Sequence, residues 1–130
     1  MSGCSPRRVS ARRDGNRVVR RAALSRVIVS DVAAVLIAEL DSALVGFCTV
    51  YVDFESVRFG KRAWVEDLAV HPDLRSLRIG KRLLGEAKDW ARAHGAARIE
   101  LESAEARKDA HRFYEREMPD WRSACFGWEL

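Results

Sequence analysis

The chain has 130 residues, of which 48% are hydrophobic and 32% charged, so it is long enough for one globular domain with a hydrophobic core. No apolar run is as long as a membrane span. The three cysteines lie too far apart for a disulfide framework or a zinc site, so we expect a reducing, cytoplasmic setting. The net charge of +4 is uneven: residues 1–26 hold eight arginines against one acid, a net of +7, and the rest holds 15 basic and 18 acidic residues, a net of −3.

Residues 1–17 combine many arginines with no hydrophobic periodicity. We expect them to form a basic, disordered arm in front of a domain over 18–130. A solvated leader is one interpretation of this arm, and a segment that binds nucleic acid through its charge is the other. Apolar residues from 17 to 29 are spaced as in a short helix, which we predict next.

Two apolar runs follow, at 33–40 and 43–54, and both are rich in strand-forming residues. They are joined by Asp41 and Ser42, residue types that favour turns. The pattern predicts a β-hairpin.

A third strand is predicted at 63–71, after the polar residues 58–62. Its apolar run is interrupted by Glu66 and Asp67. Because successive side chains of a strand point to opposite faces, Asp67 is expected opposite Glu66 unless a β-bulge intervenes.

The remaining elements alternate between helix and strand. Apolar residues recur at helical spacing up to His94, and Gly95 follows as a helix-ending residue. A strand is predicted at 97–102, a helix at 105–117 and a last strand at 121–130, in which Cys125 would be buried like Cys48 in the hairpin. The order predicts a mixed α/β (α+β) fold with a mostly antiparallel sheet.

Basic residues and a glycine gather where the third strand gives way to the helix: Arg75, Arg78, Gly80 and Lys81. A helix N-terminus carries unpaired N–H groups and about half a positive charge, so it attracts phosphate. Gly80 lets a ligand approach the backbone closely. The alternative is an ordinary solvated helix start.

Two segments carry a family resemblance. Residues 65–84 read VEDLAVHPDLRSLRIGKRLL, which resembles the acetyl-CoA-binding motif of the GNAT (Gcn5-related N-acetyltransferase) family: a strand and a proline, then Arg/Gln-x-x-Gly-x-Gly/Ala opening a helix. Arg75 and Gly80 match its first and last positions, while Arg78 replaces its first glycine. Residues 109–115, DAHRFYE, resemble a later helix of the family. The resemblance covers about 30–130 and implies a GNAT-like acyl-CoA N-acyltransferase fold that lacks the usual first strand and helix.

The resemblance also implies that acetyl-CoA is the cosubstrate. Backbone N–H groups of the splayed third strand would bind the pantetheine arm, and the following loop would hold the pyrophosphate. Arg78 could crowd the pyrophosphate or pair with it, and it costs about 1 kcal/mol if its φ must be positive. The cofactor-binding residues implied are Leu68, Ala69, Val70, Arg75, Ser76, Leu77, Arg78, Ile79, Gly80, Lys81 and Arg107.

Catalysis by a GNAT protein needs two proton movements, since only the free amine attacks and the thiolate leaves more easily with an acid. The resemblance implies Glu66 as the base and Tyr114 as the acid. The plainer alternatives are that Glu66 pairs with an arginine and that Tyr114 is a core aromatic. No metal site is expected.

The expected activity is therefore acetyl-CoA-dependent N-acetylation of an amine by direct attack in a ternary complex. A non-catalytic CoA-binding remnant and a nucleic-acid-binding module acting through the basic arm are the alternatives, and nucleic acid is the less favoured partner. A sheet face left uncovered by missing N-terminal elements would invite a homodimer. The sequence does not identify the acceptor, and no membrane partner is expected.

Overall fold

The computed structural model describes residues 22–130, so the predicted basic arm at 1–17 lies outside the described residues. The chain forms two compact units, of which the first ends at Glu100 and the second begins at Leu101.

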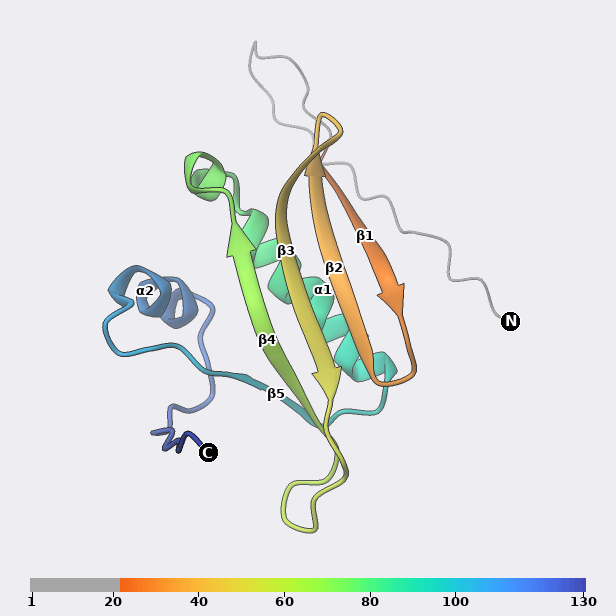
Figure 1. Ribbon diagram of the computed structural model, residues 1–130, viewed down its shortest axis with the longest axis vertical. Helices are drawn as coiled ribbons and strands as arrows, with labels where there is room; N and C mark the ends of the chain where they lie inside the picture. Colours follow the sequence, from red (N-terminus) through yellow and green to blue (C-terminus); the bar gives the residue numbers. More distant parts are fainter. Residues whose placement is uncertain (1–21) are drawn as a thin grey trace. The chain divides into compact units, whose positions relative to one another are not determined.

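The first unit is built on a five-stranded sheet with the strand order β1-β2-β3-β4-β5 (Figure 1). The four strands from β1 to β4 are antiparallel neighbours, which confirms the predicted hairpin and the mostly antiparallel sheet. Asp41 and Ser42 of the hairpin turn both have positive φ. The strands are β1 (Ala22–Val29), β2 (Ala33–Leu40), β3 (Ala43–Val52), β4 (Arg62–Val70) and β5 (Arg98–Leu101).

The helix predicted at 17–29 is wrong for the part that the structure describes, because residues 22–29 form strand β1. A strand therefore does precede the hairpin, contrary to expectation. Its chain turns at once into β2, and the Ser30 side-chain oxygen accepts a hydrogen bond from the Ala33 N–H at 2.8 Å. The apolar spacing fitted either structure, and backbone pairing with β2 decides for the strand.

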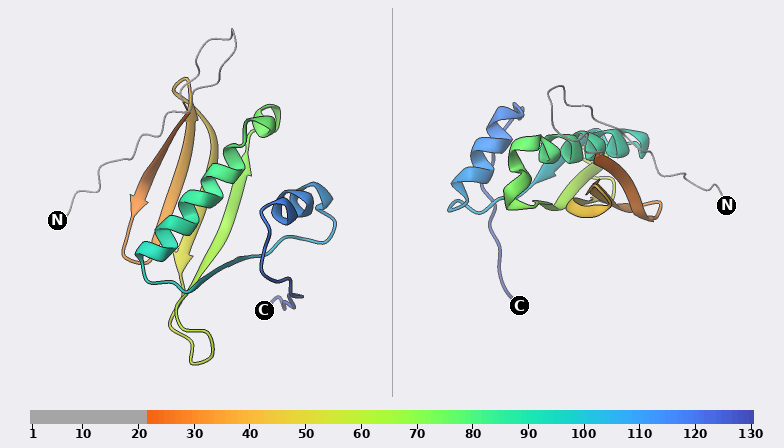
Figure 2. Two further views of the ribbon diagram at one scale, coloured as in Figure 1. Left: turned by 180° about the vertical axis from the view of Figure 1, so that it is seen from behind. Right: turned by 90° about the horizontal axis from the view of Figure 1, so that it is seen from above.

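Helix α1 (Ile79–Ala93) covers one face of the sheet, which we call the inner face (Figure 2). It packs on β2, β3 and β4. Leu83, Ala87 and Trp90 of the helix are fully buried, as are Cys48 and Val50 of β3, so a continuous apolar core forms here. None of the helices among residues 22–130 is long and apolar enough to cross a membrane.

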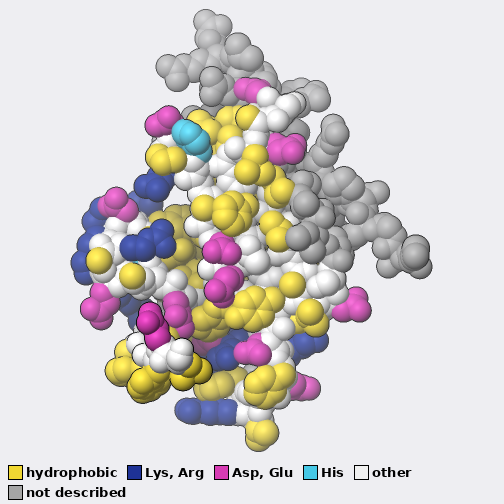
Figure 3. Space-filling view, in the orientation of Figure 1, with side chains coloured by type: hydrophobic (Ala, Val, Ile, Leu, Met, Phe, Trp, Pro, Cys, Tyr) yellow, Lys and Arg dark blue, Asp and Glu magenta, His cyan; other side chains and the backbone are white. Residues whose placement is uncertain are grey.

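The opposite, outer face of the sheet is more open (Figure 3). Its side chains include Ile37 of β2 and Phe47, Thr49 and Tyr51 of β3, all half-buried. Within residues 22–100, α1 is the only α-helix, and it lies on the inner face.

The second unit contains helix α2 (Lys108–Arg116), within the helix predicted at 105–117. The strand predicted at 121–130 is wrong: these residues have no regular structure and are exposed, including Cys125, which was expected to be buried. Strand residues must exchange backbone hydrogen bonds with a neighbouring strand, and α2 is the only regular element that the structure describes after Leu101. An apolar pattern alone does not supply that neighbour.

Candidate active site

A β-bulge interrupts β4 at Glu66. Asp67 pairs with Thr49 and Val65 with Val50, so Glu66 is the extra residue. Val50 and Val65 are buried on the inner face, which places Thr49 and its partner Asp67 on the outer face. Glu66 follows an inward residue and is exposed, so both carboxylates lie on the outer face. A β-bulge is the predicted exception to Asp67 lying opposite Glu66, and it applies here because the bulge shifts the alternation.

Acidic side chains stand among hydrophobic ones on the outer face (Figure 3). Glu66 and Asp67 form an exposed acidic pair on this face. Among the side chains that the structure describes, neither carboxylate forms an ion pair. The arginine partner considered for Glu66 is therefore not found among them. A cationic ligand meets two uncompensated negative charges here.

Strands β4 and β5 start at the same end of the sheet. The Ala97 N–H, just before β5, donates to the Lys61 carbonyl, just before β4, with an N···O distance of 2.8 Å. Since β5 has four residues and β4 has nine, the last residues of β4 extend beyond the end of β5. The predicted cofactor-binding residues 68–70 belong to this extending part, where β5 does not continue along the second backbone edge of the strand.

An ion-pair network holds the shared start of the two strands. Arg62 contacts Asp53 and Glu100, each at 3.1 Å, and Arg98 contacts Glu100 at 2.7 Å. The hydrogen bond from Arg62, together with the backbone N–H of Phe54, lowers the pKa of Asp53, and the same bond raises the pKa of Arg62. The network fixes β5 against β4 where they begin.

The predicted phosphate loop forms a short 3₁₀ helix, η1 (Pro72–Leu77), followed directly by α1. The His71 Nδ1 accepts a hydrogen bond from the Asp73 N–H at 3.2 Å and so caps η1. Arg78 joins the two helices with φ 58° and ψ 26°, the left-handed conformation that favours glycine. This is the position where the GNAT motif has its first glycine, and Arg78 is strained there by about 1–2 kcal/mol.

The start of α1 is suited to an anion. No side chain caps it, and its first turn has no acidic residue. Arg75, Arg78 and Lys81 are exposed around it, while Ile79 is buried and can offer only its backbone. The pyrophosphate of CoA therefore fits the charge and the hydrogen-bond donors of this turn.

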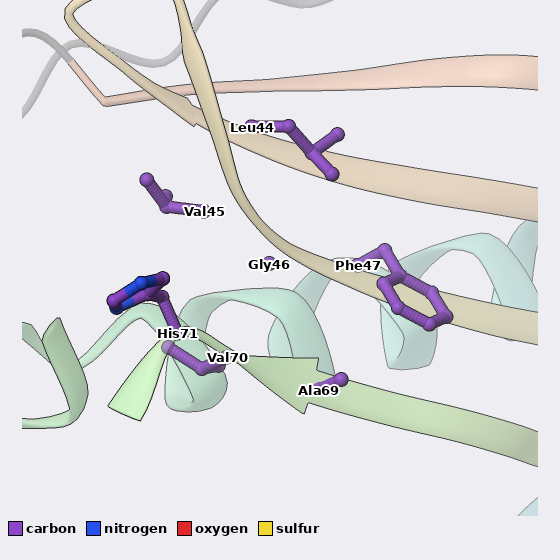
Figure 4. Close-up of a pocket in the computed structure, with 7 residues that line it drawn as sticks. All are labelled: Leu44, Val45, Gly46, Phe47, Ala69, Val70 and His71. Atoms are coloured by element: carbon purple, nitrogen blue, oxygen red, sulfur yellow. The ribbon is translucent and has the colours of Figure 1, made fainter. Parts of the chain in front are cut away.

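An open pocket of about 280 Å³ lies where β3 and β4 meet the start of η1 (Figure 4). Gly46 of β3 allows the close approach of its neighbours, because a Cβ atom there would lie 2.9 Å from the Ala69 carbonyl oxygen and 3.2 Å from Leu83 Cδ1. The sequence analysis did not predict this pocket. The one sequence feature that could have indicated it is Gly46, because a glycine inside an apolar strand often marks a close approach of backbone or ligand. The lining residues are Leu44, Val45, Gly46, Phe47, Ala69, Val70 and His71.

The other two predicted site residues, Tyr114 and Arg107, belong to the second unit. Tyr114 is half-buried on α2, with its ring centroid 5.2 Å from that of Phe113. Arg107 is exposed immediately before α2. The predicted residues that the first unit brings together are Glu66, 68–70 and 75–81.

The fold is that of the acetyltransferases. Aminoglycoside N-acetyltransferase AAC(6')-Iy in complex with CoA matches with a TM-score of 0.70 over 78% of this chain and 68% of that chain, at 15% identity. Glucosamine-6-phosphate N-acetyltransferase from Arabidopsis thaliana matches with a TM-score of 0.67 over 78% of this chain and 69% of that chain, at 19% identity. At these identities the likeness shows the fold alone.

The sequence assigns the family. The family model described as "Acetyltransferase (GNAT) family" matches residues 10–118, and the chain therefore belongs to this family. The uncharacterized N-acetyltransferase YhdJ of Bacillus subtilis is 44% identical over 63 residues, which are 48% of this chain and 44% of that protein. The aminoalkylphosphonate N-acetyltransferase of Salmonella typhimurium is 36% identical over 74 residues, 57% of this chain and 48% of that protein. The chain thus spans about half the length of these relatives.

Proposed function

We propose that this protein transfers the acetyl group of acetyl-CoA to an amine by direct attack in a ternary complex. The observation that carries the proposal is the bulge at Glu66, which places a carboxylate on the outer face two residues before Leu68. Residues 68–70 are where β4 extends past β5. Membership of the GNAT family supports the same reaction.

Two parts of the first unit would hold acetyl-CoA, which supplies the acetyl thioester when it is bound. The exposed backbone edge of residues 68–70 would hydrogen-bond the pantetheine arm. One N–H group there would stabilise the negative charge that develops on the carbonyl oxygen, an effect worth about 3–4 kcal/mol in other enzymes. The first turn of α1, with Arg75 and Lys81, would hold the pyrophosphate.

Glu66 would accept the proton that the acceptor must lose. A substrate ammonium has a pKa near 10 and cannot attack until it is deprotonated. Glu66 would take this ammonium proton before the attack, directly or through water, and release it to the solvent. As the new N–C bond forms and the C–S bond breaks, the nitrogen loses its second proton, which balances the proton that the leaving sulfur gains. Tyr114 is the proposed donor of a proton to the leaving sulfur.

Thermal unfolding with and without excess acetyl-CoA tests cofactor binding, with free adenosine as the control ligand. Acetyl-CoA at 100 times its Kd should add about 2.7 kcal/mol to the free energy of unfolding. No shift for acetyl-CoA in a folded protein would contradict the proposal.

Glu66→Gln tests the base. It should lower kcat by about 10²-fold or more, because the glutamine amide cannot accept the proton. Glu55→Gln is a matched control, since Glu55 is exposed in the loop between β3 and β4 and outside the site. Unchanged turnover in a folded Glu66→Gln variant would remove Glu66 from the mechanism.

A CoA-binding domain without transferase activity is the second candidate. It is favoured by Arg78, whose left-handed backbone places a long side chain where the family motif has a glycine. An acetyl-CoA-induced shift without acetylation of any amine in a broad screen would favour this candidate.

A further inference from the structure

We infer that the acceptor is an amphiphilic amine: its amino group reacts at Glu66, and an alkyl or aryl group occupies the pocket beside Phe47 and Ala69. The inference rests on the proposed function, because that function is what places the reacting amine at Glu66. The pocket then determines which kind of chemical group the acceptor carries besides its reacting amino group.

The pocket is lined almost entirely by apolar groups. Four of its residues are Leu44, Val45, Phe47 and Val70, and His71 is its one titratable side chain. Leu44 is 60% exposed. Figure 4 shows Phe47 and Ala69 on neighbouring strands at one end of the pocket and His71 at the other. An apolar group placed here would remove from water the exposed side chains of Leu44 and Ala69 and the exposed part of Phe47.

Three residues of the pocket, Leu44, Phe47 and Ala69, lie on the same outer face of the sheet as the acidic pair. Ala69 pairs with Phe47, and Asp67 pairs with Thr49, so Asp67 and Ala69 lie on the outer face two residues apart along β4. Two residues of a strand span about 7 Å. A short linker therefore connects an ammonium group beside Glu66 and Asp67 to an apolar group beside Phe47.

Charge and polarity distinguish this class from other amines. The two carboxylates attract the ammonium group. A polyamine or an amino sugar would bring charged or hydroxyl groups into the apolar pocket, and burying such groups without partners is unfavourable. In a simple arylalkyl or alkyl amine, the ammonium group can lie beside the two carboxylates while the apolar group fills the pocket.

Calorimetry tests the inference without any acetyl donor, by comparing phenethylamine with ethylamine. Burying a phenyl group should make phenethylamine bind at least about tenfold more tightly than ethylamine. Phe47→Ala should remove most of this preference. Phe54→Ala is the matched control, because Phe54 is 79% exposed in the loop after β3 and should leave the preference unchanged. Asp67→Asn should weaken the binding of both amines.

A series of unbranched amines on the unsubstituted protein gives a second measurement that does not depend on the folding of a variant. Affinity should rise from ethylamine to hexylamine. Equal affinity across the series, or a preference for phenethylamine that survives in folded Phe47→Ala, would overturn the inference. Failure of the proposed function has a different signature, namely no thermal shift with acetyl-CoA and no acetylation of any amine.

Discussion

Replacing Gly46 by alanine should destabilise the protein, because β3, β4 and α1 meet at this residue. The new Cβ atom would lie 2.9 Å from the Ala69 carbonyl oxygen, 3.2 Å from Leu83 Cδ1 and 3.4 Å from Ile79 Cγ2. The first of these is a backbone atom of a paired strand, so it cannot rotate away. Either β4 or the start of α1 must move.

The cost of such overpacking is about 1–3 kcal/mol. Alanine recovers about 0.5–1 kcal/mol, because glycine loses more conformational freedom on folding. With mid-range values for both effects the net loss is about 1 kcal/mol, which should lower the melting temperature by about 4 °C in a domain of this size. Since the displaced atoms adjoin Val70 and Ile79, acetyl-CoA should also stabilise the Gly46→Ala variant less than the original protein.

Gly85→Ala is the matched control. Gly85 lies in the middle of α1, and a Cβ atom there meets no heavy atom within 4 Å. Alanine is favoured over glycine inside a helix by about 0.8–1.0 kcal/mol, so the melting temperature should rise. Differential scanning calorimetry compares the melting temperature of each variant with that of the original protein, once without and once with acetyl-CoA. A Gly46→Ala variant that melts at or above the temperature of the original protein would refute the packing argument.

Three further predictions concern single residues. Arg78→Gly should be more stable to urea than Arg78→Ala by about 0.5–1 kcal/mol, because only glycine relieves the left-handed backbone, and equal stabilities would contradict this. Burial and, secondarily, the charge of Asp67 raise the pKa of Cys48 to about 12, so the folded protein keeps its proton where the unfolded chain releases it. Urea titrations should therefore show a free energy of unfolding that falls by about 1.4 kcal/mol per pH unit above about pH 9, a slope that Cys48→Ala lacks. Asp53, whose pKa is lowered mainly by Arg62, should stabilise the fold above its unfolded pKa of about 4 and lose this effect at lower pH. The difference in melting temperature between Asp53→Asn and the original protein should thus be present at pH 7 and disappear in acid.

Much of the first unit could be predicted from the sequence alone. The hairpin at 33–54 follows from two strand-like runs around Asp41 and Ser42, and α1 follows from apolar residues at helical spacing that end before Gly95. These signals are local, since turn preferences and periodicity depend on neighbouring residues in the chain. The family also followed from local motifs, and the match over residues 10–118 confirms it.

Other features were decided by contacts between distant parts of the chain. Residues 22–29 became a strand because β2 offers a pairing edge, whereas 121–130 show the pattern of a strand and form none. The register against β3 creates the bulge that brings Asp67 beside Glu66 on one face. Backbone pairing and strand register depend on hydrogen bonds to a partner far away in the sequence, so only the tertiary structure could decide them.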